Sequence, residues 1–318
     1  MKPTLVLPHD LELPGLMAIR ACGLKAALPT LKVKGHVDLL LHGYSEGKRA
    51  TMEARCGELR FAVKACNKDS APEAQLYREL GACGLGPAVA NGSHGVRVPH
   101  FLAYNPDLHL LATGWLEGPT VNELIKDGQG ERAGELASRW FRRTASLPVI
   151  LGPTYDSAHV LEKVAGWIAD LALSDPVLGS AALSLARELS ATPPPPGSPG
   201  LLHGTLYARH IIDAGAAGLI DWDAFGHGPL EFDAGVFLAT VWRIRLSHPE
   251  CASAVARAEQ AFLAGTAGRL AGGALAWYRA AALMDIAHRL DNRSKHNWKA
   301  RAMALLSEAG RLAVTAAA

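Results

Sequence analysis

The chain has 318 residues, of which 49% are hydrophobic and 19% charged, enough apolar material to bury the core of a two-lobed globular protein. A formal net charge of +2 gives no strong sign of a nucleic-acid-binding protein, and an aromatic content of 6% supplies few side chains on which bases could stack. The apolar runs are too short to span a bilayer, prolines and acids break the N-terminus where a signal peptide would lie, and the five cysteines show no metal or redox spacing. We therefore expect a soluble cytoplasmic protein with neither membrane nor nucleic acid as partner.

The first third of the chain predicts a small sheet. Residues 1–35 indicate an irregular or partly helical N-terminal extension. Residues 37–66 contain three short strands, separated by turns at residues 45–49 and 56–58. Lys64 closes the third strand.

A helix is predicted after these strands, within residues 69–87. Ser70 can cap it, Pro72 suits its first turn, and Leu76 and Leu80 repeat at helical spacing before glycine breakers. Farther along, residues 108–125 indicate a strand, a connecting segment and another helix. The remaining helices are predicted within 131–147, 157–191, 234–246, 251–270, 272–290 and 294–316.

Residues 192–200, TPPPPGSPG, form a stiff proline-rich loop that can be neither helix nor central strand. We expect this loop to lead into the next strand, and an exposed proline segment for a protein partner is the alternative. Residues 201–233 then read as a short apolar strand, a polar loop from His203 to Arg209, a second strand and a glycine-rich turn. A third strand, at residues 218–220, delivers Asp221 to a loop.

This last segment resembles the aminoglycoside phosphotransferase family, which is related to choline kinase and to the protein kinases. The resemblance rests on His203-Gly204-Thr205 with His210 five residues later, and on Ile220-Asp221-Trp222-Asp223. It implies a bilobal, α+β, protein kinase-like fold with a small antiparallel sheet lobe plus one helix at 36–113 and a larger, mainly helical lobe at 114–318. It also implies phosphoryl transfer from ATP or GTP, with Mg²⁺, to a hydroxyl group of a small molecule.

The resemblance assigns roles in the large lobe. Thr205 stands in the place of the family's catalytic aspartate and His210 in that of a metal-binding asparagine. Asp221 is implied as the metal ligand, and Asp223 is a candidate metal ligand or a substitute for the missing aspartate. Because a threonine hydroxyl cannot act as a general base near neutral pH, impaired or atypical catalysis is expected. His203 and Asp233 are implied as structural supports of the loop, without a direct role in catalysis.

The resemblance also assigns nucleotide-binding roles in the first lobe. Lys64 would pair with the α and β phosphates, and Glu73 would be its partner on the helix. Glu79 is a competing partner, but six residues along a helix it faces away from Glu73. Two backbone segments would complete the nucleotide site: a glycine-containing turn over the phosphates (Gly43, Ser45, Gly47 and Lys48) and a hinge for adenine (Gly114, Trp115 and Leu116).

Three functions are compatible with these residues. The first is a small-molecule phosphotransferase, and the second is a pseudokinase that binds nucleotide or a protein partner as a regulator or scaffold. The third is another reaction in the same cleft, such as nucleotidyl transfer. A zinc site is disfavoured, because the spacing of its candidate ligands matches no compact motif (His203, His210, Asp221, Asp223 and His227).

The charge of the C-terminal part bears on the acceptor. Residues 234–318 contain 11 lysines and arginines against 5 acids. A polycationic aminoglycoside needs an acidic pocket, so this excess favours a neutral or anionic acceptor such as a sugar or a phosphorylated metabolite. A solvated basic helix face is the alternative explanation.

Overall fold

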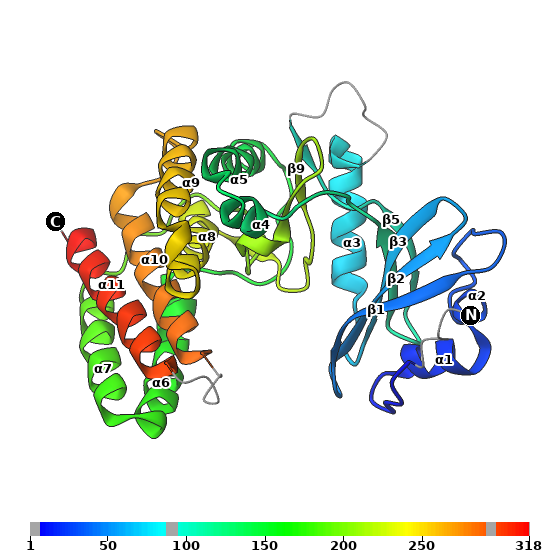
Figure 1. The fold of residues 1–318 in the computed structure, drawn as a ribbon, viewed down its shortest axis with the longest axis horizontal. Helices are drawn as coiled ribbons and strands as arrows, with labels where there is room; N and C mark the ends of the chain where they lie inside the picture. Colours follow the sequence, from blue (N-terminus) through cyan, green and yellow to red (C-terminus); the bar gives the residue numbers. More distant parts are fainter. Residues whose placement is uncertain (1–6, 87–94, 291–296, 318) are drawn as a thin grey trace. The chain divides into compact units, whose positions relative to one another are not determined.

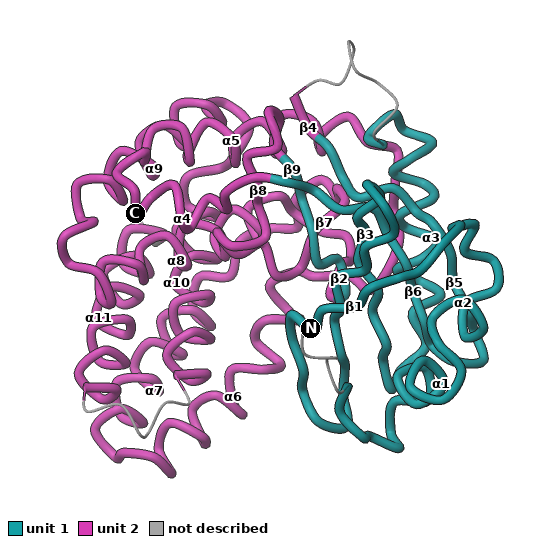
Figure 2. The backbone as a smooth tube through the Cα atoms, turned by 45° about the vertical axis from the view of Figure 1, so that its right-hand side comes forward, with its two compact units in different colours: residues 1–93, 97–117, 218–223 teal, residues 94–96, 118–217, 224–318 magenta. Residues whose placement is uncertain are grey.

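The structure is a computed structural model that describes residues 7–86, 95–290 and 297–317. It confirms the predicted α+β, protein kinase-like fold. The chain divides into two compact units, coloured separately in Figure 2. The first unit comprises residues 1–93, 97–117 and 218–223, and the second comprises residues 94–96, 118–217 and 224–318.

A five-stranded antiparallel sheet forms the centre of the first unit, in the order β1-β2-β3-β6-β5. The three strands predicted within residues 37–66 are confirmed. The strand bounds are β1 (Asp38–Ser45), β2 (Arg49–Cys56), β3 (Leu59–Cys66), β5 (Phe101–Asn105) and β6 (Leu110–Gly114). In the register of β2 with β3, Thr51 lies opposite Lys64.

The two faces of this sheet differ. Helices α1 (Pro14–Cys22) and α2 (Leu24–Ala27) belong to the same buried apolar cluster as Met52 and Val63. Since side chains alternate along a strand, Lys64 leaves the opposite face. Helix α3 (Ala71–Leu80) lies on that side of the sheet (Figure 1). The N-terminal segment therefore completes the apolar core, and the face carrying Lys64 is left for polar side chains.

Helix α3 was correctly predicted, but its predicted cap was wrong. Ser70 occupies the cap position without a side-chain capping bond. The Ala71 N–H donates instead to Asp69 Oδ1 at 2.8 Å. Pro72 lies in the first turn, as expected, where a backbone N–H would have no partner within the helix.

Helices dominate the second unit, and the predicted helical regions are confirmed where the structure describes them. Their bounds are α4 (Val121–Lys126), α5 (Gly130–Thr144), α6 (Ser157–Ser174), α7 (Pro176–Ala191), α8 (Leu230–Ser247), α9 (Ala252–Gly265), α10 (Gly272–His288) and α11 (Trp298–Ala317). Asp175 separates α6 from α7, and its Oδ1 accepts the Val177 and Leu178 N–H groups at the start of α7. Part of the helix predicted within 294–316 lies outside the described residues.

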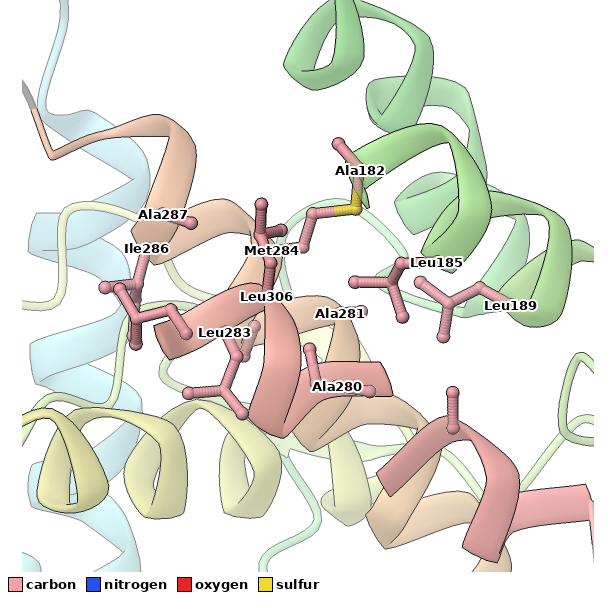
Figure 3. Packing of buried hydrophobic residues seen from close by; sticks show 14 of the residues in the cluster. Ala182, Leu185, Leu189, Ala280, Ala281, Leu283, Met284, Ile286, Ala287 and Leu306 are labelled. Carbon is pink, nitrogen blue, oxygen red and sulfur yellow. The ribbon is translucent and has the colours of Figure 1, made fainter. Parts of the chain in front are cut away.

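The core of the second unit is built around α10, which is buried on most of its surface. Figure 3 shows Leu283 and Met284 of α10 beside Leu306 of α11, with Leu185 of α7 nearby. Trp277 is buried in the same cluster and donates its indole N–H to the Leu189 carbonyl at 2.9 Å. This core holds the helices that line the cavity described below.

Short strands frame the loop that follows the proline-rich segment. Strand β7 (Gly200–Leu202) pairs antiparallel with β10 (Gly226–Gly228). Residues 193–199 of the predicted proline-rich loop form neither helix nor strand, but its last residue, Gly200, already belongs to β7. A second small sheet has the order β4-β9-β8, with bounds Val96–Arg97, Ala217–Leu219 and Ile211–Asp213. Among the described residues, no helix is both long and apolar enough to cross a membrane.

Candidate functional site

A buried ion-pair cluster lies on the polar face of the sheet in the first unit. Lys64 Nζ is 2.8 Å from Glu73 Oε1 and 2.9 Å from Asp221 Oδ1. Only 12% of the Lys64 side chain is exposed, so burial lowers its pKa, but the attraction of Glu73 and Asp221 outweighs burial and raises it well above the ordinary value. Lys64 therefore stays charged. Glu79 is exposed on α3, and Glu73 is the helix acid that contacts Lys64.

The segment after β9 turns sharply to present its carboxylates. Asp221 has a backbone φ of 68°, in the left-handed region that non-glycine residues seldom occupy. The next residue, Trp222, is fully buried and donates its indole N–H to the Leu219 carbonyl at 3.3 Å. This anchor holds Asp221 against Lys64, while Asp223 beyond it is more exposed.

Arg49, the first residue of β2, joins this cluster, and we did not single it out from the sequence. Its Nη1 lies 2.5 Å from Asp223 Oδ2 and 3.6 Å from Asp221 Oδ1. Arg49 is two residues from Thr51, so it leaves the same sheet face as Lys64. Side chains alternate between the two faces along β2, so the register of β2 with β3 would have placed Arg49 on the same face as Lys64.

The glycine-containing turn is held by a carboxylate from the N-terminal segment. Gly47 adopts a φ of 63°, and its N–H donates to Asp10 Oδ2 at 2.8 Å. Tyr44 donates its hydroxyl to the same oxygen at 2.9 Å. The Lys48 N–H donates to the Ser45 carbonyl at 3.0 Å and closes the turn. The Gly47 N–H is therefore already bonded to the Asp10 carboxylate. Gly43, the other glycine of this segment, lies where the pairing of β1 with β2 is irregular.

A second charged network lies beside Trp115, in the segment that the sequence predicts as the hinge. Glu53 is only 1% exposed and accepts hydrogen bonds from Arg60 Nε at 2.6 Å and from Arg55. Its other oxygen lies 2.7 Å from His42 Nε2. The Arg60 hydrogen bonds are the largest cause that lowers the pKa of Glu53 to about 2, against the opposing effect of burial. The Arg60 guanidinium lies 4.2 Å from the centre of the Trp115 ring.

The main chain of the predicted hinge is partly engaged as well. Gly114 donates its N–H to the His100 carbonyl at 2.8 Å. A side chain at position 114 would collide with the His100 ring, since a Cβ there would lie 2.2 Å from Nδ1. Trp115 and Leu116, which follow, are half-buried.

In the second unit, the loop at Thr205 is fixed through its backbone. Asp233 is fully buried and accepts the His203 N–H at 2.5 Å and the Gly204 N–H at 3.0 Å. Gly204 has a φ of 78°, and a Cβ there would lie 1.8 Å from the Ala224 carbonyl oxygen. Only glycine fits this turn, which sets the position of Thr205.

His210 is directed into the same loop. Its Nδ1 lies 2.8 Å from the Thr205 carbonyl oxygen, which also accepts the Tyr207 N–H at 2.7 Å. The His210 ring is stacked on that of His203, with centroids 5.3 Å apart, and His210 is 4% exposed. With this arrangement, His210 supports the loop through Nδ1, which cannot at the same time bind a metal.

A cavity of about 250 Å³ lies within the second unit and includes Gly204 and Thr205 in its wall. Its other walls are aliphatic, charged and aromatic, and the aromatic residues are Tyr155, Trp167, Tyr207, Phe232 and Tyr278. The rings of Tyr155 and Phe232 are stacked, with centroids 5.3 Å apart. The charged lining residues are Lys163, Asp285 and Arg289, and Arg289 Nε donates to Asp285 Oδ1 at 2.8 Å. Asp285, the carboxylate among the described lining residues, is thus already paired.

Asp221 and Asp223 do not fit a divalent metal ion as they are arranged, because both already contact cations. Mg²⁺ commonly binds one or two carboxylates, with phosphate and water oxygens. Here Asp221 contacts Lys64 and Arg49, and Asp223 contacts Arg49. Throughout the described part of the chain, no three or more His, Cys, Asp or Glu side chains are grouped to hold a metal ion.

Comparisons with known proteins place the chain in a family. The sequence model described as "Phosphotransferase enzyme family" matches residues 49–302. The chain therefore belongs to the phosphotransferase enzyme family, as the sequence motifs indicated. No curated protein matches its sequence.

Solved structures share the fold. A thermostable mutant of aminoglycoside phosphotransferase APH(4)-Ia, in complex with AMP-PNP and hygromycin B, matches with a TM-score of 0.62 and 14% identity, over 93% of this chain and 97% of that one. A choline/ethanolamine kinase family protein from Mesorhizobium loti matches with a TM-score of 0.56 and 15% identity, over 93% and 92%. Choline kinase LicA from Streptococcus pneumoniae matches with a TM-score of 0.59 and 12% identity, over 90% and 97%. At these identities the likeness establishes the fold alone.

Proposed function

We propose that this protein is a nucleotide-dependent phosphotransferase that acts, with weak intrinsic turnover, on a hydroxyl group of a small molecule. The family supports phosphoryl transfer from ATP, typically with Mg²⁺, and GTP is an equal candidate in our proposal. The observation that carries the proposal is the buried contact of Lys64 with Glu73 and Asp221. A buried lysine held by two acids is costly to maintain without a function, and an ammonium group aimed by them suits phosphate binding.

A nucleotide should stabilise the protein through Lys64. With ATP or GTP at about 100 times its dissociation constant, we expect about 2.7 kcal/mol of added stability. For a chain of this size that corresponds to a rise of several degrees in the unfolding midpoint. The rise should be abolished in Lys64→Met, because the variant removes the charge that meets the phosphates.

Lys68→Met is the matched control, since Lys68 is exposed just beyond β3 and should leave the nucleotide effect intact. Both variants should be measured by thermal unfolding with each nucleotide. An unchanged midpoint with both nucleotides in the parent protein would contradict the proposed function. A rise that survives in Lys64→Met would show that nucleotide binds elsewhere.

We further propose that the acceptor is compact and neutral or anionic, with an apolar or ring-shaped body. The cavity beside Thr205 has apolar walls with five aromatic side chains. Asp285 is neutralised by Arg289, which leaves Lys163 as the charge available to a ligand among the described lining residues. Among the lining residues that the structure describes, Asp285 is the acid, and it already pairs with Arg289, so a polycation would gain little compensating charge there. The sugars and phosphorylated metabolites favoured by the sequence fit this charge better than a polycationic aminoglycoside.

This acceptor class can be tested by binding. Calorimetry with kanamycin or hygromycin B should detect no tight binding, whereas anionic hydroxyl compounds should bind and should lose affinity in Lys163→Met. Lys163→Arg, which keeps the charge, is the control. Tight binding of a cationic aminoglycoside would overturn the argument.

The second candidate function is a pseudokinase that binds nucleotide or a protein partner. Thr205 favours it, because a hydroxyl cannot take up the acceptor's proton. The hydrogen bond from the Gly47 N–H to Asp10 also favours a pseudokinase, because this N–H is then not available to a phosphate. Phosphoryl transfer, however, passes through a loose transition state in which positioning and charge matter more than the base, so slow transfer remains our first proposal.

A further inference from the structure

Arg49 occupies the position of a counter-ion between two carboxylates. Its guanidinium contacts Asp223 at 2.5 Å and Asp221 at 3.6 Å, and the contact joins residues 174 positions apart in the chain. The Arg49 side chain is 42% exposed and that of Asp223 is 44% exposed. The arginine is thus held in place by acids but remains accessible to a ligand.

The charges of this cluster are nearly balanced without a metal ion. Three carboxylates (Glu73, Asp221 and Asp223) are joined in a chain of contacts by two cations, Lys64 and Arg49. The sum is a single negative charge. A divalent ion that bound both aspartates would have to displace Arg49 or lie against its positive charge.

Arg49 also has the geometry to meet phosphate. The register of β2 with β3 puts Arg49 and Lys64 on one face of the sheet, on neighbouring strands. A guanidinium offers a planar fork of donors that binds two phosphate oxygens at once. Together with Lys64, it would present two fixed positive charges to a triphosphate.

We propose that Arg49 is the resident cation of the nucleotide site, so that the protein binds a nucleoside triphosphate without a divalent metal ion. The inference rests on the proposed function, since it concerns how the same nucleotide is held. On binding, the guanidinium exchanges part of its contact with Asp223 for phosphate oxygens. Lys64 keeps its contact with Glu73 throughout.

The test compares the affinity for ATP and GTP, by calorimetry, in excess EDTA and in excess Mg²⁺. The parent protein should show affinities within about threefold in the two conditions. Arg49→Gln should lose about 10- to 100-fold in EDTA, the value of a hydrogen bond to a charged group, and Mg²⁺ should restore most of it. Arg49→Lys should keep most of the metal-free affinity, and Arg20→Gln, at an exposed position in α1, should match the parent.

A second readout follows the metal itself. Binding of Mn²⁺ in the absence of nucleotide, measured by electron paramagnetic resonance, should be weak in the parent and stronger in Arg49→Gln, because Asp221 and Asp223 lose their competing cation. Nucleotide binding that requires Mg²⁺ in the parent, or that is unchanged in Arg49→Gln, would overturn the inference and leave the proposed function standing. Absence of nucleotide binding in both conditions would overturn the proposed function and the inference with it.

Discussion

Replacing Thr205 by aspartate should raise the rate of nucleotide-dependent phosphoryl transfer by about 10²- to 10⁴-fold, the usual contribution of a general base. The loop should accept the new side chain without moving. The Thr205 carbonyl is held by the Tyr207 N–H and by His210, and Asp233 holds the preceding amides, so the side chain itself supports none of these contacts. Thr205 also lies in the wall of the aromatic cavity, where an acceptor hydroxyl would be placed under our proposal.

The rate should be measured as formation of ADP or GDP over a panel of neutral and anionic hydroxyl compounds. Thr205→Asn is the matched control, because it has nearly the size of aspartate but accepts no proton. A higher rate in the aspartate variant alone would indicate that the rest of the site supports phosphoryl transfer. Equal rates in both variants, with nucleotide binding retained, would contradict the prediction and favour the pseudokinase.

The strands and the helix of the first unit could be predicted because residues close together in the sequence determine them. Alternation and turn residues define the strands of residues 37–66, and helical spacing defines α3. The contacts that join separate segments of this unit are not local. Asp10 meets Gly47 across 37 positions and Arg49 meets Asp223 across 174, and no spacing rule connects such pairs before the sheet is assembled.

The same distinction applies to the candidate site. Lys64, Asp221 and Thr205 were found because they lie within motifs of fixed spacing. The network of Glu53 with Arg60 was missed, although both lie in predicted strands, because an acid and a base in a strand usually indicate a solvated face. The burial of Glu53 under Arg60 depends on the pairing of β2 with β3, which brings the two side chains to one face, where Arg60 also contacts Trp115.

Asp233 should make the stability of the protein depend on pH. Burial raises the pKa of Asp233 to about 7, although the hydrogen bonds from the His203 and Gly204 amides act in the opposite direction. Because the folded pKa lies above the unfolded value of 3.8, the stability that the protonated acid contributes is complete below about pH 4 and is lost as the pH rises to about 7. A shift of about three units corresponds to about 4 kcal/mol.

Asp233→Asn should remove this dependence. Its amide oxygen can accept one of the two N–H groups but its NH₂ faces the other, so at pH 5 the variant should be less stable by about 1 to 3 kcal/mol. At pH 8 the parent has lost the protonated acid and the deficit of the variant should vanish or reverse. Urea unfolding of both proteins at the two pH values measures the change, with Glu131→Gln, an exposed position in α5, as the control. A deficit that is the same at pH 5 and pH 8 would mean that Asp233 is ionised throughout, and that the two backbone donors outweigh its burial.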